Sequence, residues 1–113
     1  ISSCTKSSNE EKDQDAPVIL RVTPPDNAVF TGSQNLSIDG TIVDDNLITE
    51  VHFHIYNAAT NALLLDIHRT PGGNGYTMHE TISVVTGTQY RIQIRAKDKF
   101  GNEGVDTNTI TVN

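Results

Sequence analysis

The sequence predicts an all-β fold, an antiparallel sandwich of seven short strands, and three observations favour it. Apolar and polar residues alternate along most of the chain after Pro17, which is the period of a strand with one buried face. The strand-like runs are short, and clusters of Gly, Pro, Asn and Asp separate them. The length of 113 residues, of which 35% are hydrophobic, suits one domain with a small core.

The expected strands follow one another from residue 18 to the end of the chain. They cover 18–22, 36–43, 51–56, 63–68, 76–84, 90–97 and 107–112. The strongest breaks between them are Pro24-Pro25-Asp26-Asn27 and the glycine-rich run from Thr70 to Gly75. Strands this short with turn residues between them are typical of a sandwich of two antiparallel sheets.

Alternation assigns a buried face to three of these strands. The side chains expected in the core are Val51, Phe53 and Ile55 of the third strand, Leu63, Leu65 and Ile67 of the fourth, and Tyr90, Ile92, Ile94 and Ala96 of the sixth. The residues between them are polar or charged in the third and sixth strands, so we expect one solvent-facing side there.

The first fifteen residues differ in composition from the rest of the chain. From Thr5 to Asp15 there is no apolar side chain, so this segment cannot offset the entropy cost of ordering by burial. We therefore expect two parts: a flexible acidic tether over residues 1–15 and a sandwich domain over residues 16–113.

The four residues Ile1-Ser2-Ser3-Cys4 resemble the lipobox of bacterial lipoproteins, and the acidic residues that follow are similar to those of surface-exposed lipoproteins of the Bacteroidetes. The resemblance implies a lipid on the Cys4 thiol. It also implies attachment to the bacterial cell envelope, at the outer membrane, facing either the periplasm or the cell surface. The alternative is an ordinary chain terminus in which the cysteine has no role.

The segment Val85-Thr86-Gly87-Thr88-Gln89-Tyr90 and the strand after it resemble the penultimate strand of fibronectin type III and related immunoglobulin-like domains. The run Asp98-Lys99-Phe100-Gly101-Asn102-Glu103 and the opening Asp15-Ala16-Pro17-Val18-Ile19 resemble bacterial immunoglobulin-like repeats. The resemblance covers residues 15–113. It implies that Tyr90 forms a tyrosine corner, with its ring in the core and its hydroxyl bonded to the chain upstream.

Charge and cysteine content exclude several classes of function. The net charge of −6, from fourteen acidic and eight basic side chains, argues against nucleic acid as a partner. No apolar run reaches the roughly 18 residues of a membrane span, so we expect membrane contact through the lipid anchor alone. One cysteine cannot form an internal disulfide. We expect the chain to be a monomer.

Four histidines are candidate ligands for zinc, copper or nickel. They are His52, His54, His68 and His79. His52 and His54 are two residues apart on one strand, so both point away from the core. If the third and fourth expected strands pair, His68 joins them, and His79 joins if the fifth strand lies alongside. Against a metal, exposed strand positions accept histidine readily, and Arg91 and Arg95 on a neighbouring strand would repel a cation.

Acidic and amide side chains in two loops form a second candidate site, for calcium. They are Asp44, Asp45 and Asn46 in one loop and Asp98, Asn102 and Glu103 in the other. In a sandwich of this topology both loops lie at the same end, as in cadherin-like domains, which the composition resembles. Calcium needs six to eight oxygen ligands. The alternative is that these are ordinary turn residues.

Catalysis has little support in the sequence. No nucleophile is accompanied by a suitably spaced base, and Cys4 lies in the expected tether. We therefore expect a non-catalytic lipoprotein module that binds, or is presented to, a protein or glycan. We expect no cofactor, with calcium left open. The expected contact surface consists of Tyr56, Arg91, Gln93 and Arg95. A metal-binding domain and an inert spacer remain the alternatives.

Overall fold

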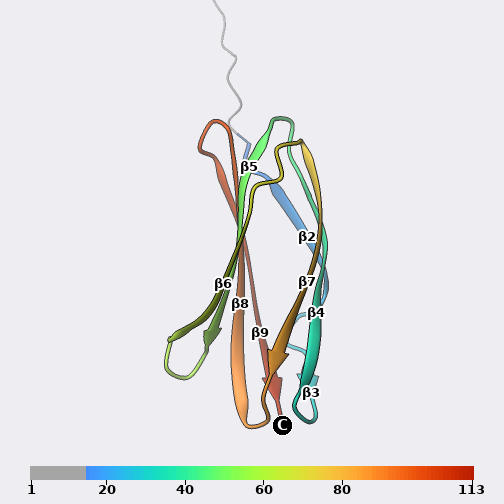
Figure 1. The fold of residues 1–113 in the computed structure, drawn as a ribbon, viewed down its shortest axis with the longest axis vertical. Helices are drawn as coiled ribbons and strands as arrows, with labels where there is room; N and C mark the ends of the chain where they lie inside the picture. The colour runs from blue at the N-terminus through green and yellow to red at the C-terminus, as the bar shows by residue number, and fades with distance from the viewer. Residues whose placement is uncertain (1–14) are drawn as a thin grey trace, which may run out of the picture.

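The computed structural model describes residues 15–113. Cys4 and all of the expected tether except Asp15 lie outside this range, so lipidation and the tether stay predictions. The described chain is built from strands and turns arranged as two facing sheets, with no helix among residues 15–113 (Figure 1). Consequently no helix in this part of the chain is long and apolar enough to cross a membrane.

The described part contains eight strands. They are β2 (Val18–Thr23), β3 (Val29–Phe30), β4 (Gln34–Val43), β5 (Ile48–Asn57), β6 (Leu63–Arg69), β7 (Gly75–Val84), β8 (Thr88–Asp98) and β9 (Glu103–Val112). The smaller sheet has the order β2-β4-β7, and the larger has the order β3-β9-β8-β5-β6. All pairs are antiparallel except β3 with β9, which is parallel.

The prediction of seven strands was therefore wrong by one, and the missing strand is β3. It has two residues, Val29 and Phe30, which is too short for alternation to show. After the Pro24-Pro25 turn, the chain leaves the smaller sheet and pairs with the end of β9 in the larger one. The other seven strands occur where the sequence predicts them, and each is longer than predicted at one or both ends.

The core lies between the sheets and consists mainly of aliphatic side chains. Those with at most 1% exposure are Ile38, Ile42, Ile48, Val51, Phe53, Met78, Val112, Ile92, Ile94, Ala96 and Ile110. The burial patterns of β5 and β8 alternate as predicted, with Val51, Phe53 and Ile55 buried on β5. One face of the larger sheet is therefore core, and the opposite face meets solvent.

The predicted burial of the β6 leucines was wrong. Leu63 is 52% exposed and Leu65 is 40% exposed, although both have the expected strand conformation. β6 is the outermost strand of the larger sheet, and its first half diverges from the smaller sheet in Figure 1. Ile67, near the other end of β6, is the member of the predicted set that packs against the core.

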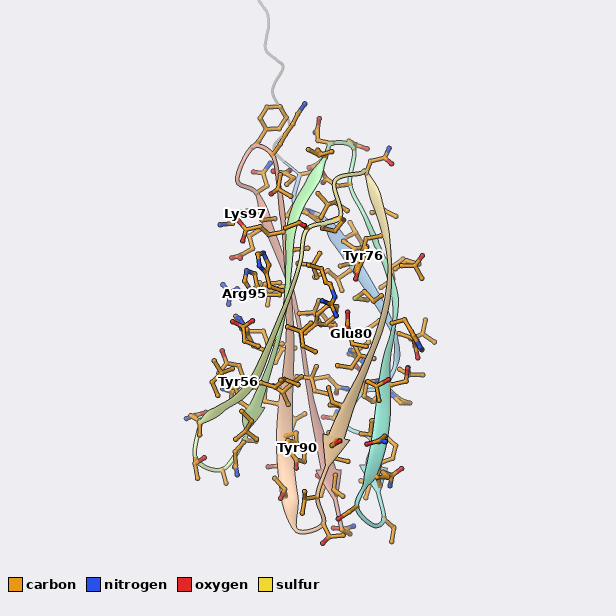
Figure 2. The ribbon with its side chains drawn as sticks, in the orientation of Figure 1. Tyr56, Tyr76, Glu80, Tyr90, Arg95 and Lys97 are labelled. Carbon is orange, nitrogen blue, oxygen red and sulfur yellow. The ribbon has the colours of Figure 1, made fainter. Side chains whose placement is uncertain are left out.

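Arginine–carboxylate pairs join the two sheets at both open edges of the sandwich. At one edge, Arg69 of β6 donates from two nitrogens to the two oxygens of Glu80 on β7, both at 2.9 Å. At the other, Arg21 Nε of β2 lies 2.7 Å from Asp106 Oδ2 of β9. Glu80, labelled in Figure 2, is only 8% exposed, so the Arg69 guanidinium compensates for a carboxylate that has lost most of its hydration.

Tyr90 forms the tyrosine corner that the resemblance to fibronectin type III domains implies. Its ring is 5% exposed and belongs to the core. Its hydroxyl oxygen accepts a hydrogen bond from the backbone N–H of Val85 at 2.9 Å. This bond fixes the turn that leads from the smaller sheet into β8.

Replacing Tyr90 with phenylalanine should lower the free energy of unfolding by about 1–3 kcal/mol, because the Val85 N–H would lose its partner. Urea denaturation measures this. Tyr56→Phe is the matched control, since Tyr56 lies on the solvent-facing side of β5, and its effect should stay within about 0.5 kcal/mol. Equal effects of the two substitutions would contradict a special role for the Tyr90 hydroxyl.

Candidate functional site

The solvent-facing side of the larger sheet gathers histidine, arginine, tyrosine and carboxylate side chains from four strands. We call it the histidine face and define it by Glu50, His52, His54 and Tyr56 of β5, Asp66 and His68 of β6, Arg91, Gln93 and Arg95 of β8, and Glu103 of β9. Tyr56 and Arg95 mark its position in Figure 2. These residues face solvent because their neighbours in the strands fill the core.

Strand register brings three of the four histidines together. β5 pairs with β6 so that His52 lies opposite His68. The two rings are stacked, with centroids 4.4 Å apart and planes 8° from parallel. The rings of His52 and His54 are 5.3 Å apart and tilted by 47°. The structure therefore places His52, His54 and His68 on one face, and metal binding there stays a prediction.

Two carboxylates that sequence reasoning missed complete this cluster. Asp66 Oδ1 lies 3.3 Å from His52 Nδ1 and 3.3 Å from His54 Nε2. Glu50 Oε1 lies 3.1 Å from the other ring nitrogen of His52, Nε2. A signal for both was present in the sequence, because Glu50 precedes His52, and Asp66 precedes His68, by two residues and so points to the same side.

His79 does not join the other histidines, which corrects its prediction as a fourth member of their cluster. The strand that carries it, β7, pairs with β4 in the smaller sheet rather than with β5 or β6. There His79 lies directly opposite Asp39, with 2.5 Å between Nδ1 and Oδ1. The sequence shows that β7 is a strand but not which sheet it enters.

The Asp39–His79 pair should make stability depend on pH. Hydrogen bonds from Ser37, His79 and Thr23 lower the pKa of Asp39 from 3.8 to about 2. The hydrogen bond to Asp39 raises the pKa of His79 above its ordinary 6.5. The contribution of Asp39 is therefore lost as pH falls through about 2, and that of His79 is lost as pH rises through its raised pKa.

His79→Gln should consequently lower Tm more at pH 5.5, where both groups of the pair are charged, than at pH 9, where less of the His79 contribution remains. Thermal unfolding of both proteins at the two pH values measures the difference. An NMR titration supplies the control, because Asp39→Asn should lower the pKa of His79. The same Tm loss at both pH values would contradict the pair's contribution.

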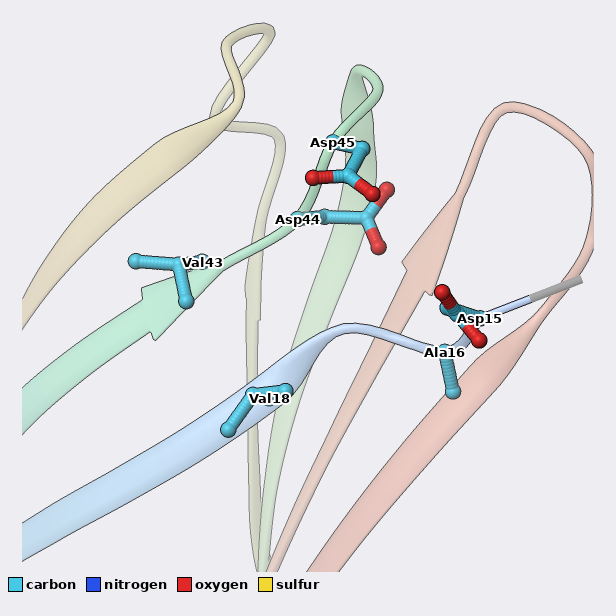
Figure 3. A pocket seen from close by; sticks show the side chains of 6 residues that line it. All are labelled: Asp15, Ala16, Val18, Val43, Asp44 and Asp45. Atoms are coloured by element: carbon cyan, nitrogen blue, oxygen red, sulfur yellow. The ribbon is translucent and has the colours of Figure 1, made fainter. Parts of the chain in front are cut away.

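The loops that carry the predicted calcium ligands meet at one end of the sandwich, as expected. The β4–β5 and β8–β9 loops are joined there by a backbone hydrogen bond from Lys99 N to Leu47 O at 2.9 Å (Figure 1). Asp44 and Asp45, together with Asp15, line an open pocket of about 380 Å³ (Figure 3). The carboxylates of Figure 3 thus come from two segments far apart in the sequence.

Most of the predicted calcium ligands already have partners within the protein. Asp98 is 1% exposed, and its carboxylate accepts hydrogen bonds from the backbone of Phe100 and Asn102 and from the Asn102 side chain, at 2.9–3.0 Å. Asp98 therefore stabilises the turn between β8 and β9. Glu103 is paired with Arg95 on the histidine face, at 2.9 Å. In the other loop, Asp44 accepts from the Asn46 N–H at 3.0 Å. Calcium binding stays a prediction.

The four residues of the predicted contact surface are contiguous. The Arg91 guanidinium lies over the Tyr56 ring, 4.4 Å from its centroid, and donates to Asn61 Oδ1 at 2.8 Å. Arg95 donates to Gln93 Oε1 at 3.0 Å. The Tyr56 ring in turn contacts that of His54 edge-on, with centroids 6.1 Å apart. One row of aromatic and guanidinium groups therefore runs along the histidine face.

Comparisons with known proteins identify the fold. No protein-family profile matches this sequence, and no curated protein matches it. Among solved structures, the fibronectin(III)-like modules of CbhA from Clostridium thermocellum are similar, with a TM-score of 0.58 and 21% sequence identity. The match covers 96% of this chain and 50% of that one, so this chain spans about half the length of its structural neighbour. The fold is therefore a β-sandwich like those of fibronectin type III modules.

Proposed function

We propose that this chain is a non-catalytic module of the bacterial cell envelope, anchored by a lipid on Cys4, and that its histidine face binds a protein or a glycan. The observation that carries the binding proposal is the row of aromatic, imidazole and guanidinium groups on that face. Tyrosine and arginine are among the side chains that contribute most of the binding energy in protein interfaces. Together they offer ring surfaces for stacking and several hydrogen-bond donors.

Pre-organisation also supports a contact role. Arg91 is held between Tyr56 and Asn61, and Arg95 is held by Glu103 and Gln93, so these long side chains are already ordered. An ordered side chain loses less conformational entropy on binding than a free one. The strands beneath are anchored by fully buried residues such as Phe53 and Ile94, which gives the face a rigid base.

The non-catalytic part of the proposal is supported by the geometry around Asp39. This carboxylate accepts hydrogen bonds from Ser37 at 2.5 Å and from His79 at 2.5 Å. In a catalytic triad the histidine lies between the acid and the serine, so that it can remove the serine proton. Here the acid lies in the middle. The arrangement therefore orders the surface of the smaller sheet and does not activate Ser37.

A glycan array and candidate envelope proteins, probed with the purified chain, test the binding proposal. Tyr56→Ala and Arg91→Ala should each weaken a detected interaction at least about tenfold, as expected for residues that supply much of an interface's energy. Thr81→Ala, on the exposed side of β7 in the other sheet, is the matched control and should change nothing. The proposed surface would be contradicted if Tyr56→Ala and Arg91→Ala left the binding intact. If the parent protein bound nothing, the alternative of an inert spacer module would be favoured.

The anchor is tested separately, by mass spectrometry of the protein isolated from its native membrane. We expect the mass of a diacylglycerol-modified Cys4 at the start of the mature chain. An unmodified Cys4, still preceded by Ile1-Ser2-Ser3, would overturn the lipid anchor without affecting the binding proposal.

A further inference from the structure

The histidine face contains a set of three metal-ligating atoms that come from two neighbouring strands. They are His52 Nδ1 and His54 Nε2 of β5 and Asp66 Oδ1 of β6, and the ligand atoms of these three residues lie within 4.8 Å of one another. We propose that they bind one divalent transition-metal ion, with zinc as the reference metal. The proposal does not depend on the protein or glycan partner proposed above.

The distances within the set are compatible with a bound metal ion. Asp66 Oδ1 is 3.3 Å from both ring nitrogens, and its contact with His52 Nδ1 is a long hydrogen bond. Zinc binds such ligands at about 2.0–2.1 Å, and tetrahedral geometry then separates neighbouring ligand atoms by about 3.3–3.4 Å. The two nitrogen–oxygen separations thus match two edges of a zinc tetrahedron.

The remaining contacts of the two histidines determine which nitrogen would bind the metal. Glu50 Oε1 lies 3.1 Å from His52 Nε2, and in the tautomer in which Nε2 donates its proton to Glu50, Nδ1 has a free lone pair. A carboxylate behind a metal-binding histidine is the usual support of such sites. In His54, Nδ1 is buried and has no hydrogen-bond partner among residues 15–113, so Nε2 is the nitrogen that faces Asp66.

His68 is a positioning residue in this arrangement and not a ligand. A second candidate set, Glu50, His52 and His68, is also close enough to hold an ion. However, the lone pairs of an imidazole lie in its ring plane, and the rings of His52 and His68 are stacked 8° from parallel. Their lone pairs therefore do not converge on one point. The rings of His52 and His54 are tilted by 47°, which permits convergence.

Of the two cationic neighbours that argue against a metal, Arg95 is neutralised in the structure by a carboxylate. Arg95, which lies opposite His52 in the sheet, is held by Glu103 through two nitrogens at 2.9 and 3.2 Å. Arg91 lies over Tyr56, beyond His54 along the strand. The carboxylates of Asp66 and Glu50, which contact the two histidines, supply the opposite charge beside the proposed ion. Three protein ligands leave a fourth tetrahedral position for water or for an atom of a partner.

Isothermal titration calorimetry of the full-length, untagged chain with zinc tests the proposal, in a Cys4→Ser background that removes the thiol as a competing ligand. We expect one ion per chain. His54→Ala and Asp66→Asn should each weaken binding at least about 100-fold, because each removes a ligand. Glu50→Gln should weaken it about 10–100-fold, as is usual for a supporting carboxylate. His79→Ala, on the other sheet, is the matched control and should leave the affinity unchanged.

His68→Phe separates the two candidate sets, because phenylalanine keeps the stack on His52 but cannot bind a metal. We expect the zinc affinity of this variant to stay within about threefold of the parent's, because only the strength of the stacking contact with His52 would change. Cobalt substitution provides a second readout, since a tetrahedral cobalt site absorbs strongly in the visible range. The proposal is overturned if zinc does not bind at millimolar concentration, if folded His54→Ala binds as tightly as the parent, or if His68→Phe abolishes binding.

Discussion

Replacing Phe53 with alanine is expected to lower the free energy of unfolding by about 3–5 kcal/mol, the usual loss for a large side chain removed from a packed core. Phe53 is 0% exposed and lies in the middle of β5, between the two sheets. Its removal would leave a cavity among aliphatic side chains that other strands hold in place, so the core cannot close around it. Urea denaturation followed by circular dichroism measures the change.

His54→Ala is the matched control for Phe53→Ala, because it changes the next residue of the same strand, on the opposite face. His54 lies on the histidine face, and its replacement should cost less than about 1 kcal/mol. Losses of similar size at the two positions would contradict the division of β5 into one core face and one solvent-facing side.

Gly40→Ala is expected to destabilise the protein by at least about 2–3 kcal/mol, at the upper end of the usual cost of overpacking. A Cβ atom at this position would lie 2.1 Å from the backbone oxygen of Leu20 and 2.9 Å from the Cα of Arg21. Both atoms belong to the backbone of β2, which cannot move away without breaking its pairing with β4. Thermal and urea unfolding should both show the loss.

Gly75→Ala is the control for Gly40→Ala, because Gly75 also lies in a strand but a Cβ there would meet nothing within 4 Å. Its effect on the free energy of unfolding should stay within about 0.5–1 kcal/mol. A small stabilisation would also agree with the prediction, because alanine lowers the conformational entropy of the unfolded chain. A Gly40→Ala protein as stable as the parent would show that β2 does not approach β4 as closely as the structure has it.

Most of the fold could be predicted because burial of one face imposes a period of two on a strand. β8 alternates throughout and β5 alternates from Val51 to Tyr56, and the buried and exposed faces of both were predicted correctly. Strand β3 was missed because an alternation of apolar and polar residues cannot be recognised in a strand of two residues. The burial of Leu63 was predicted wrongly, because an irregularity in the β5–β6 pairing places it opposite Tyr56, on the solvent-facing side. Local sequence does not contain that information.

The candidate site was predictable only in part, for a related reason. Alternation places His52 and His54 on one face without knowledge of any other strand. The roles of Asp66 and His68 depend on the register between β5 and β6, and a slip of one residue would turn both towards the core. Whether His79 joins them depends on which sheet β7 enters. Tyr90 was assigned from its resemblance to a known motif, and the structure confirms the assignment.

If the histidine face is the functional surface of this chain, anomalous diffraction from crystals grown with zinc should show it most directly. One ion is expected, bonded at about 2.0–2.2 Å to His52 Nδ1, His54 Nε2 and Asp66 Oδ1. An ion between Glu50 and His68, an ion at the acidic end near Asp44 in place of this one, or no ion at the histidine face would contradict the account.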